Sequence, residues 1–188
     1  MRRVGIIGVG DFGIFSTGAF KYLEDFELFA FSDIAPTIKP RDAIFYRDYH
    51  DLIDDERIDV VYVATENYNH VKMSIEALER GKAVLCEKPI FINQAEKESI
   101  EEAVKTYNRP FKVNFVLPNS RLYSKIFQIN QSQELGKLLF INIENYATET
   151  QITKNWYFND SKSGGWFATS DIHFFELISH LSEEDLEV

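Results

Sequence analysis

Val4-Gly5-Ile6-Ile7-Gly8-Val9-Gly10-Asp11-Phe12-Gly13 carries an apolar, strand-like run straight into the pattern Gly8-x-Gly10-x-x-Gly13. Each glycine of the pattern has its own task. Gly8 permits a tight turn, Gly10 removes a side chain where a pyrophosphate approaches, and Gly13 lets helix and strand pack closely. Phosphates would bind backbone N–H groups at the positive end of the helix that follows. The stretch therefore predicts a dinucleotide-binding strand–turn–helix unit, with Asp11 and Phe12 among the cofactor-binding residues.

Asp33 lies twenty residues after Gly13, at the end of the second expected strand. A carboxylate at this place accepts both hydroxyls of a ribose and repels a 2′-phosphate. No arginine or lysine follows it before Lys39, so a partner for that phosphate is missing nearby. We therefore expect NAD rather than NADP. The alternative to a dinucleotide site is that these residues are only a glycine-rich turn and a surface aspartate in an unrelated α/β protein.

Apolar β-branched runs alternate with segments of helical period up to about residue 117, which is typical of a parallel sheet covered on both faces. The clearest helical stripe lies in residues 93–107, with Asn93 as its N-cap; residues 71–80 behave similarly. We expect a Rossmann domain, a doubly wound parallel sheet, over residues 1–117. The expected strands lie near residues 3–8, 27–32, 43–46, 59–64, 83–87 and 111–116.

After Pro118 the pattern changes, and we expect residues 118–188 to begin an α+β substrate domain with an open sheet. Leu122, Ile126 and Ile129 mark one helix. Alternating apolar residues predict a half-exposed strand over residues 138–146. A loop containing Gly164-Gly165 then leads to a last helix whose apolar stripe is Phe174, Leu177, Ile178 and Leu181.

Composition narrows the class of protein. The 188 residues are 45% hydrophobic and carry a formal net charge of -10, which argues against a general nucleic-acid surface. The single cysteine, Cys86, cannot form an intrachain disulfide, which fits a reducing compartment. No signal peptide is apparent and no stretch approaches the length of a membrane span. We expect a cytoplasmic protein without a membrane or nucleic-acid partner.

Polar side chains follow two neighbouring expected strands. Residues 65–70 follow one strand, and Glu87-Lys88-Pro89 closes the next. Ligands of open α/β sheets bind at the carboxyl edge where such strand ends meet. Together with Gly164-Gly165 and His173, these motifs resemble the glucose-fructose oxidoreductase, inositol dehydrogenase and rhizopine-catabolism family, written Gfo/Idh/MocA. The resemblance covers essentially the whole chain.

The resemblance implies roles for particular residues. It places Lys88 near the nicotinamide and the substrate hydroxyl, where it orients the oxygen and stabilises negative charge, and makes Lys88–Pro89 a cis peptide bond. It makes His173 the group that takes the hydroxyl proton. Thr169, four residues earlier, stands where the family has Asp or Asn and cannot carry that charge. Pro118 replaces a family arginine. The remaining cofactor-binding residues that the resemblance implies are Thr65, Asn67, His70 and Glu87.

Two local patterns have rival interpretations. His173, Glu176 and His180 share one helical face, which raises a metal site, although the resemblance explains His173 better and we expect no metal. Trp156 and Trp166 either stack on a sugar or cover the edge of a core.

The leading hypothesis is an NAD-dependent oxidoreductase acting on a secondary alcohol of a sugar, polyol or nucleotide-linked sugar. The alternatives are a non-catalytic dinucleotide-binding relative and, more weakly, an assembly module. Family members continue past the helix of His173 and complete an open sheet that commonly forms the oligomer interface. The chain is thus expected to be C-terminally truncated, and to form a homo-oligomer through its C-terminal sheet or to be poorly soluble.

Overall fold

The computed structural model describes residues 1–36, 42–146 and 155–182, apart from the side chains of residues 11, 12, 14, 15, 21 and 155. The chain divides into two units, Met1–Asn114 and Phe115–Val188, and each is described by itself.

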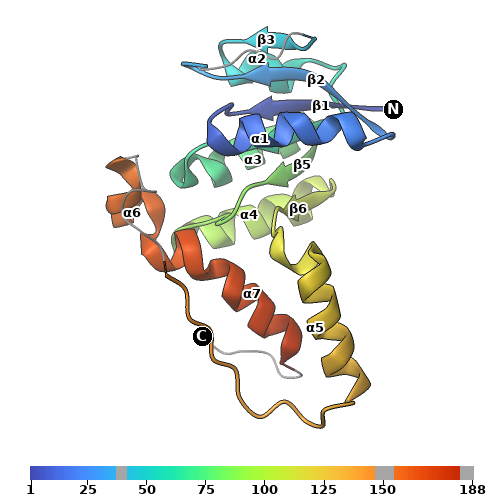
Figure 1. Cartoon of the computed structure of the whole chain (residues 1–188). Coiled ribbons are helices and arrows are strands. Elements are labelled where there is room, and N and C mark those ends of the chain that lie inside the picture. Colours follow the sequence, from blue (N-terminus) through green and yellow to red (C-terminus); the bar gives the residue numbers. More distant parts are fainter. Residues whose placement is uncertain (37–41, 147–154, 183–188) are drawn as a thin grey trace. The chain divides into compact units, whose positions relative to one another are not determined.

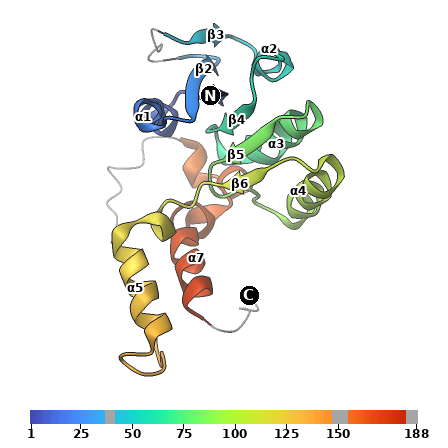
Figure 2. The same cartoon turned by 90° about the vertical axis from the view of Figure 1, so that its right-hand side faces the viewer.

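The first unit is built on a parallel sheet, and the order of its strands is β3-β2-β1-β4-β5-β6 (Figures 1 and 2). This is the order of a doubly wound Rossmann sheet, so the predicted fold class is confirmed. The strand β6 ends three residues earlier than expected. The strands are β1 Arg2–Ile7, β2 Phe26–Ser32, β3 Ile44–Tyr46, β4 Val60–Val63, β5 Ala83–Cys86 and β6 Phe111–Val113.

Helices cover both faces of this sheet. Figure 2 shows α1 on one face and α2, α3 and α4 on the other. Two apolar clusters fill the corresponding layers: one includes Val61, Val63 and Leu78, the other Ile6 and Tyr62. The helical segments are α1 Asp11–Ala19, η1 Phe20–Tyr22, α2 Tyr49–Asp54, η2 Asn67–Asn69, α3 His70–Glu79 and α4 Gln94–Tyr107.

The helix α4 shows how the local sequence fixes an element. Its N-cap is Asn93, whose Oδ1 accepts a hydrogen bond of 2.9 Å from the backbone N–H of Glu96. Its last turn is followed by Asn108 in the left-handed region, with φ of 48°, a common way for a helix to end. Both the cap and the range predicted from the sequence are confirmed.

The described parts of the second unit contain helices but no paired strand. The predicted helices around Leu122 and Leu177 are confirmed as α5 and α7. The predicted strand over residues 138–146 is wrong, because no described segment pairs with it in the ladder that a strand requires. The segments are η3 Leu117–Asn119, α5 Arg121–Ser132, η5 Asn155–Phe158, α6 Asp160–Ser163, η6 Phe167–Asp171 and α7 Ile172–Leu181.

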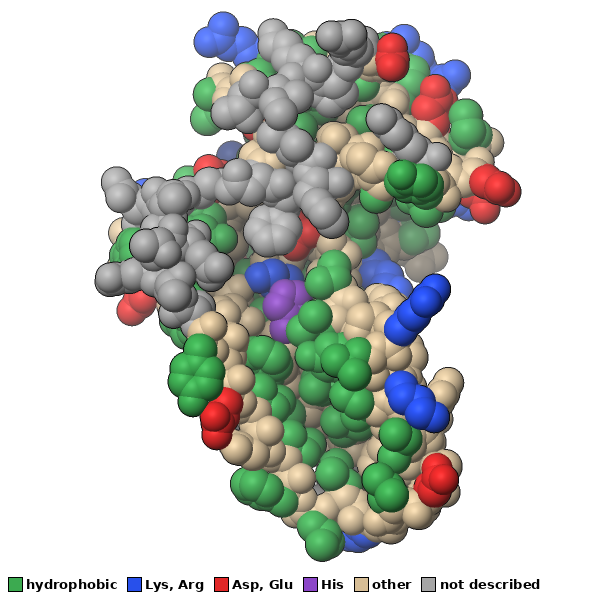
Figure 3. Space-filling view, in the orientation of Figure 1, with side chains coloured by type: hydrophobic (Ala, Val, Ile, Leu, Met, Phe, Trp, Pro, Cys, Tyr) green, Lys and Arg blue, Asp and Glu red, His purple; other side chains and the backbone are tan. Residues whose placement is uncertain are grey.

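Many large hydrophobic side chains of the second unit face solvent. They gather over α5 and α7 in the view of Figure 3. Leu139 and Phe140, in the extended segment after α5, are 89% and 81% exposed. Leu177 and Leu181 on α7 are buried, but the second unit leaves many of its other large apolar side chains exposed.

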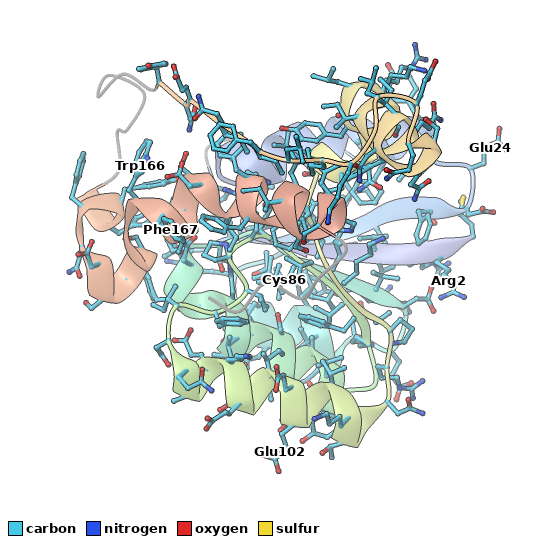
Figure 4. All side chains as sticks on the ribbon, turned by 90° about the horizontal axis from the view of Figure 1, so that it is seen from below. Arg2, Glu24, Cys86, Glu102, Trp166 and Phe167 are labelled. Carbon is cyan, nitrogen blue, oxygen red and sulfur yellow. The ribbon has the colours of Figure 1, made fainter. Side chains whose placement is uncertain are left out.

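Two further observations bear on the class of protein. Within the described ranges, no helix is both long and apolar enough to cross a membrane. Cys86 is fully buried on β5, at the centre of Figure 4, and burial raises the pKa of its thiol. A thiol with a raised pKa is a poor nucleophile, so Cys86 serves the core.

Candidate functional site

The glycine turn, residues 8–13, follows β1. It lies at the point where the chain crosses from one half of the sheet to the other. β1 pairs with β2 on one side and with β4 on the other, and ligands of such sheets bind outside the carboxyl ends at this switch point. Gly8 has a φ of +92°, and a Cβ there would lie 2.6 Å from the carbonyl oxygen of Ala64. Its own N–H donates to the Ser32 carbonyl oxygen at 2.8 Å. Only glycine fits this turn.

Gly13 lets α1 start close to the same turn, because a Cβ on it would collide with the carbonyl oxygen of Gly8. Gly10 is the N-cap of α1 and offers no capping side chain. The first N–H groups of a helix lack intrahelical acceptors and bind phosphate well. A cradle from which side chains are excluded at a helix N-terminus fits a dinucleotide. The side chains of Asp11 and Phe12, expected to contribute, lie outside the described part of the structure.

Asp33 follows β2 and reaches the glycine turn. Its Oδ2 accepts a hydrogen bond of 2.8 Å from the backbone N–H of Val9, and its Oδ1 accepts one of 2.7 Å from the N–H of Ala35. The position of Asp33 in the sequence predicts only its role toward the ribose. The contact with Val9 joins two strand ends 24 residues apart, and no spacing rule shows it.

His70 links the two polar loops at the same edge. Its Nδ1 lies 2.7 Å from the carbonyl oxygen of Pro89, and its Nε2 lies 3.0 Å from that of Thr65. The ring is 1% exposed, and burial lowers the pKa of His70 while the two carbonyl oxygens work against this. His70 therefore holds the Thr65 loop and the Pro89 loop together.

Two other predicted residues lie in the loop after β4. The hydroxyl of Thr65 donates to the sulfur of Met73 at 3.6 Å. Asn67 is buried at the start of η2. Both residues are thus packed into the loop that carries them, beside the glycine turn that contacts Ala64.

Glu87 is the centre of a buried polar network that the sequence analysis missed. Its Oε1 accepts hydrogen bonds from the hydroxyl of Tyr62 and, at 2.7 Å, from Nδ2 of Asn114. The Tyr62 hydroxyl also accepts a hydrogen bond of 3.2 Å from Ser16 on α1. Glu87 is 8% exposed, so the donors offset the cost of burying its charge. The signal for this network in the sequence is Tyr62, because a tyrosine inside the apolar run of β4 needs a buried hydrogen-bond partner for its hydroxyl.

Lys88 comes next, and its peptide bond to Pro89 is cis, as the resemblance implies. The Lys88 side chain is half-buried. Burial lowers the pKa of its ammonium group, and the carboxylate of Glu87 works in the opposite direction. A lysine in such a setting can give a proton to, or share one with, a substrate oxygen more readily than a solvated one.

Thr169 and His173 belong to the second unit. Residues Phe167–Asp171 form a π-helical turn before α7, so the spacing between these two residues is not that of a regular α-helix. The hydroxyl of Thr169 is buried and directed at the backbone carbonyl oxygens of Gly165, at 2.8 Å, and Ser163, at 3.2 Å. Its oxygen is thus engaged inside the turn.

The ring of His173 packs edge-on against Phe115, with 6.1 Å between ring centroids. Two residues of the rival metal interpretation bond to each other instead: Nδ1 of His180 lies 2.7 Å from the carbonyl oxygen of Glu176. No cluster of three or more His, Cys, Asp or Glu side chains suited to a metal occurs in the described residues.

The two tryptophans differ in their surroundings. Trp156 stacks on Tyr157, with 4.2 Å between ring centroids. Trp166 is exposed beside Phe167 at the N-terminal end of the helical segment that continues into α7 (Figure 4).

Comparison with known proteins gives one family. The family model GFO_IDH_MocA, described as an oxidoreductase family with an NAD-binding Rossmann fold, matches residues 2–115. The chain is 26% identical over 191 residues to a myo-inositol 2-dehydrogenase of Thermotoga maritima, an alignment that covers 98% of this chain and 56% of the relative.

Solved structures of dehydrogenases show the same fold. A myo-inositol 2-dehydrogenase from Lactobacillus plantarum superimposes with a TM-score of 0.84 at 25% identity, covering 96% of this chain and 56% of that one. A scyllo-inositol dehydrogenase from Lactobacillus casei, with bound cofactor NAD(H) and scyllo-inositol, superimposes with a TM-score of 0.84 at 22% identity, covering 97% and 56%. The present chain thus spans about half the length of the relatives that it matches.

Proposed function

The chain belongs to the oxidoreductase family with an NAD-binding Rossmann fold, and from this membership we propose that it transfers a hydride between a nicotinamide and a secondary alcohol. The substrate class that we propose is a polyol or sugar, since relatives of the chain include myo-inositol dehydrogenases. One observation carries the proposal: the glycine turn, Asp33 and Glu87-Lys88-Pro89 all follow strands at one edge of one sheet.

Within this proposal, residues 1–117 bind the dinucleotide and residues 118–188 begin the substrate domain. NAD is the cofactor rather than NADP, because Asp33 follows β2 and residues 34–36 add no basic side chain that could pair with a 2′-phosphate. When bound, NAD would supply the hydride acceptor. The chain's own part is to hold the dinucleotide on the Gly8–Gly13 backbone and to manage the proton of the substrate hydroxyl.

Lys88 orients the substrate oxygen and stabilises the negative charge that develops on it, a task that suits an ammonium group whose pKa is lowered by burial. Glu87, held by Tyr62 and Asn114, fixes the strand end from which Lys88 extends. His173 takes the hydroxyl proton as general base. Thr65, Asn67 and His70 shape the loop that flanks the cofactor.

A second candidate function is dinucleotide binding without turnover. It is favoured by Thr169, which stands where the resemblance places Asp or Asn and whose hydroxyl is engaged by the carbonyl oxygens of Gly165 and Ser163. A threonine in this state provides no negative charge to His173.

The test measures NAD binding by calorimetry and NADH formation with myo-inositol, scyllo-inositol and a panel of sugars. We expect NAD binding and turnover of at least one polyol. Lys88→Met should reduce turnover about a hundredfold or more with little change in NAD affinity. Lys72→Met, which alters an exposed lysine on α3, is the matched control and should leave both quantities unchanged. If the unaltered chain bound NAD but formed no NADH, and Lys88→Met left the NAD affinity unchanged, the second candidate would be established instead.

We also propose that the chain forms a homo-oligomer through its second unit. The support is the group of exposed hydrophobic side chains there, including Leu139 and Phe140, which water contacts unfavourably. Because the predicted strand over residues 138–146 lacks a ladder, the proposed surface is this segment together with α5 and α7, rather than a completed sheet.

A further inference from the structure

The carboxylate of Asp33 has two kinds of neighbour. On one side, its Oδ1 accepts from the N–H of Ala35, two residues on, which is an ordinary local turn. On the other side, its Oδ2 accepts from the N–H of Val9, inside the glycine turn. A carboxylate offers about four lone-pair sites, so about two remain after these bonds. Two is also the number of hydroxyl groups that a ribose presents.

The bond to Val9 differs from the other hydrogen bonds that hold the turn. The N–H of Gly8 donates to the Ser32 carbonyl oxygen, and the N–H of Ala64 donates to that of Ile7, both at 2.8 Å. These two bonds join backbone to backbone and survive any side-chain substitution. The Val9 bond depends on a side chain. Val9 is 1% exposed, so water cannot readily replace a lost acceptor.

We propose that Asp33 is a positioning residue for the phosphate-binding turn as well as the ligand of the ribose. One carboxylate then sets the direction of the Val9 peptide, next to Gly10, and also selects the cofactor. The inference rests on the proposed function in so far as it assumes that the dinucleotide binds at the glycine turn.

This double role changes what a substitution at Asp33 does. If Asp33 only bound the ribose hydroxyls and repelled a 2′-phosphate, a neutral residue would weaken NAD and strengthen NADP. If Asp33 also braces the turn, removing its carboxylate loosens the backbone that binds the pyrophosphate of either cofactor. Affinity for NAD and for NADP then falls together, and cofactor preference cannot be reversed at this position alone.

The test compares Asp33→Ala and Asp33→Asn with the unaltered chain. Amide hydrogen exchange, followed by NMR in the absence of any nucleotide, reports the brace directly. We expect the Val9 amide to exchange about tenfold faster or more in Asp33→Ala. Asn retains one acceptor oxygen, so the Val9 amide in Asp33→Asn should exchange at a rate between those of the unaltered chain and Asp33→Ala. Calorimetry with NAD and with NADP should show both affinities about tenfold or more weaker in Asp33→Ala.

Asp48→Ala is the matched control. Asp48 makes the same kind of local turn, its Oδ1 accepting from the N–H of His50 at 2.9 Å, but this bond caps α2 and not the helix at the glycine turn. It should leave Val9 exchange and both affinities unchanged. Circular dichroism spectra verify that each variant is folded.

Unchanged exchange at Val9, with NADP binding strengthened in Asp33→Ala, would overturn the inference and leave Asp33 a ribose ligand only. If the unaltered chain bound neither nucleotide, the proposed function would fail. The exchange experiment, which uses no nucleotide, would still uphold or overturn the brace.

Discussion

Glu87 shows most clearly how single residues set up the proposed chemistry. Its carboxylate is buried next to Lys88, and its two donors, Tyr62 and Asn114, come from β4 and from the end of β6. Three neighbouring strand ends are thus joined through one oxygen atom. A network of this kind is stable only while every member is present, because a buried charge that loses a donor is expensive.

Tyr62→Phe tests this network. The change removes one hydroxyl and leaves Glu87 with a donor fewer, so we expect the free energy of unfolding in urea to fall by about 1–3 kcal/mol. Tyr107→Phe is the matched control, since the Tyr107 hydroxyl donates to Glu79 at 2.8 Å on the surface. It should cost less than about 1 kcal/mol. Equal losses in the two variants would show that burial of Glu87 carries no special weight.

His70 gives the first unit a pH dependence of known sign. Burial lowers the pKa of His70 in the folded chain, while an unfolded histidine has a pKa near about 6.5. Below that pH the unfolded state binds more protons, so the free energy of unfolding falls as the pH falls from about 6.5 toward the lowered pKa. Above about pH 6.5 this contribution does not vary.

We expect His70→Gln to flatten that acid-side slope in urea unfolding at about pH 7.5 and about pH 5.5. A wild-type chain that gained stability on acidification would contradict the assignment. It would mean that the carbonyl oxygens of Thr65 and Pro89 together hold the ring as a cation.

The sequence reveals some of these residues and hides others for physical reasons. Gly8 and Gly13 are recognisable because a turn with φ of +92° and a close backbone approach admit only glycine. The Asp33–Val9 bond and the Tyr62–Glu87 bond are not, because each joins residues more than twenty positions apart that meet only when the strands pair. Thr169 was predicted as a site residue from position alone, and its bonds inside a π-turn leave no trace in the sequence.

At the scale of elements, caps and periodicity predicted α4 well, since both are local properties of the chain. Asn93 accepts from the N–H of Glu96, and Glu96 in turn accepts from the N–H of Ile92 at 2.9 Å. This reciprocal pair satisfies donors that a helix start otherwise leaves without acceptors.

Asn93→Ala removes the cap, and we expect it to lower the free energy of unfolding by about 1 kcal/mol. The neighbouring change Gln94→Ala is the control. Gln94 is exposed and caps nothing, so its replacement should stay within about 0.5 kcal/mol. Denaturant unfolding of both variants decides the matter, and a cap variant as stable as its control would contradict the role of Asn93.

The segment over residues 138–146 marks the limit of local prediction. Its alternation of apolar and polar residues is a genuine strand pattern, but a strand exists only when another segment supplies the ladder. Among the described residues none does so. Periodicity reports what a segment can do, and pairing depends on the rest of the molecule.

The whole molecule combines a first unit with two well-filled apolar layers and a second unit that leaves large hydrophobic side chains exposed. We expect sedimentation velocity to show association that increases with concentration. Leu139→Asp together with Phe140→Asp should weaken it while NAD affinity stays the same. A chain that remained monomeric at every concentration would rule out the proposed self-association.

Hydride transfer from a polyol carbon to a nicotinamide is the activity that we propose for this chain. The most direct measurement incubates the chain with NAD and myo-inositol deuterated at its carbinol carbons, and determines the mass of the NADH formed. The account predicts NADH that carries one deuterium, with formation about a hundredfold or more slower in Lys88→Met. NAD that binds but yields no labelled NADH with any polyol or sugar would contradict it.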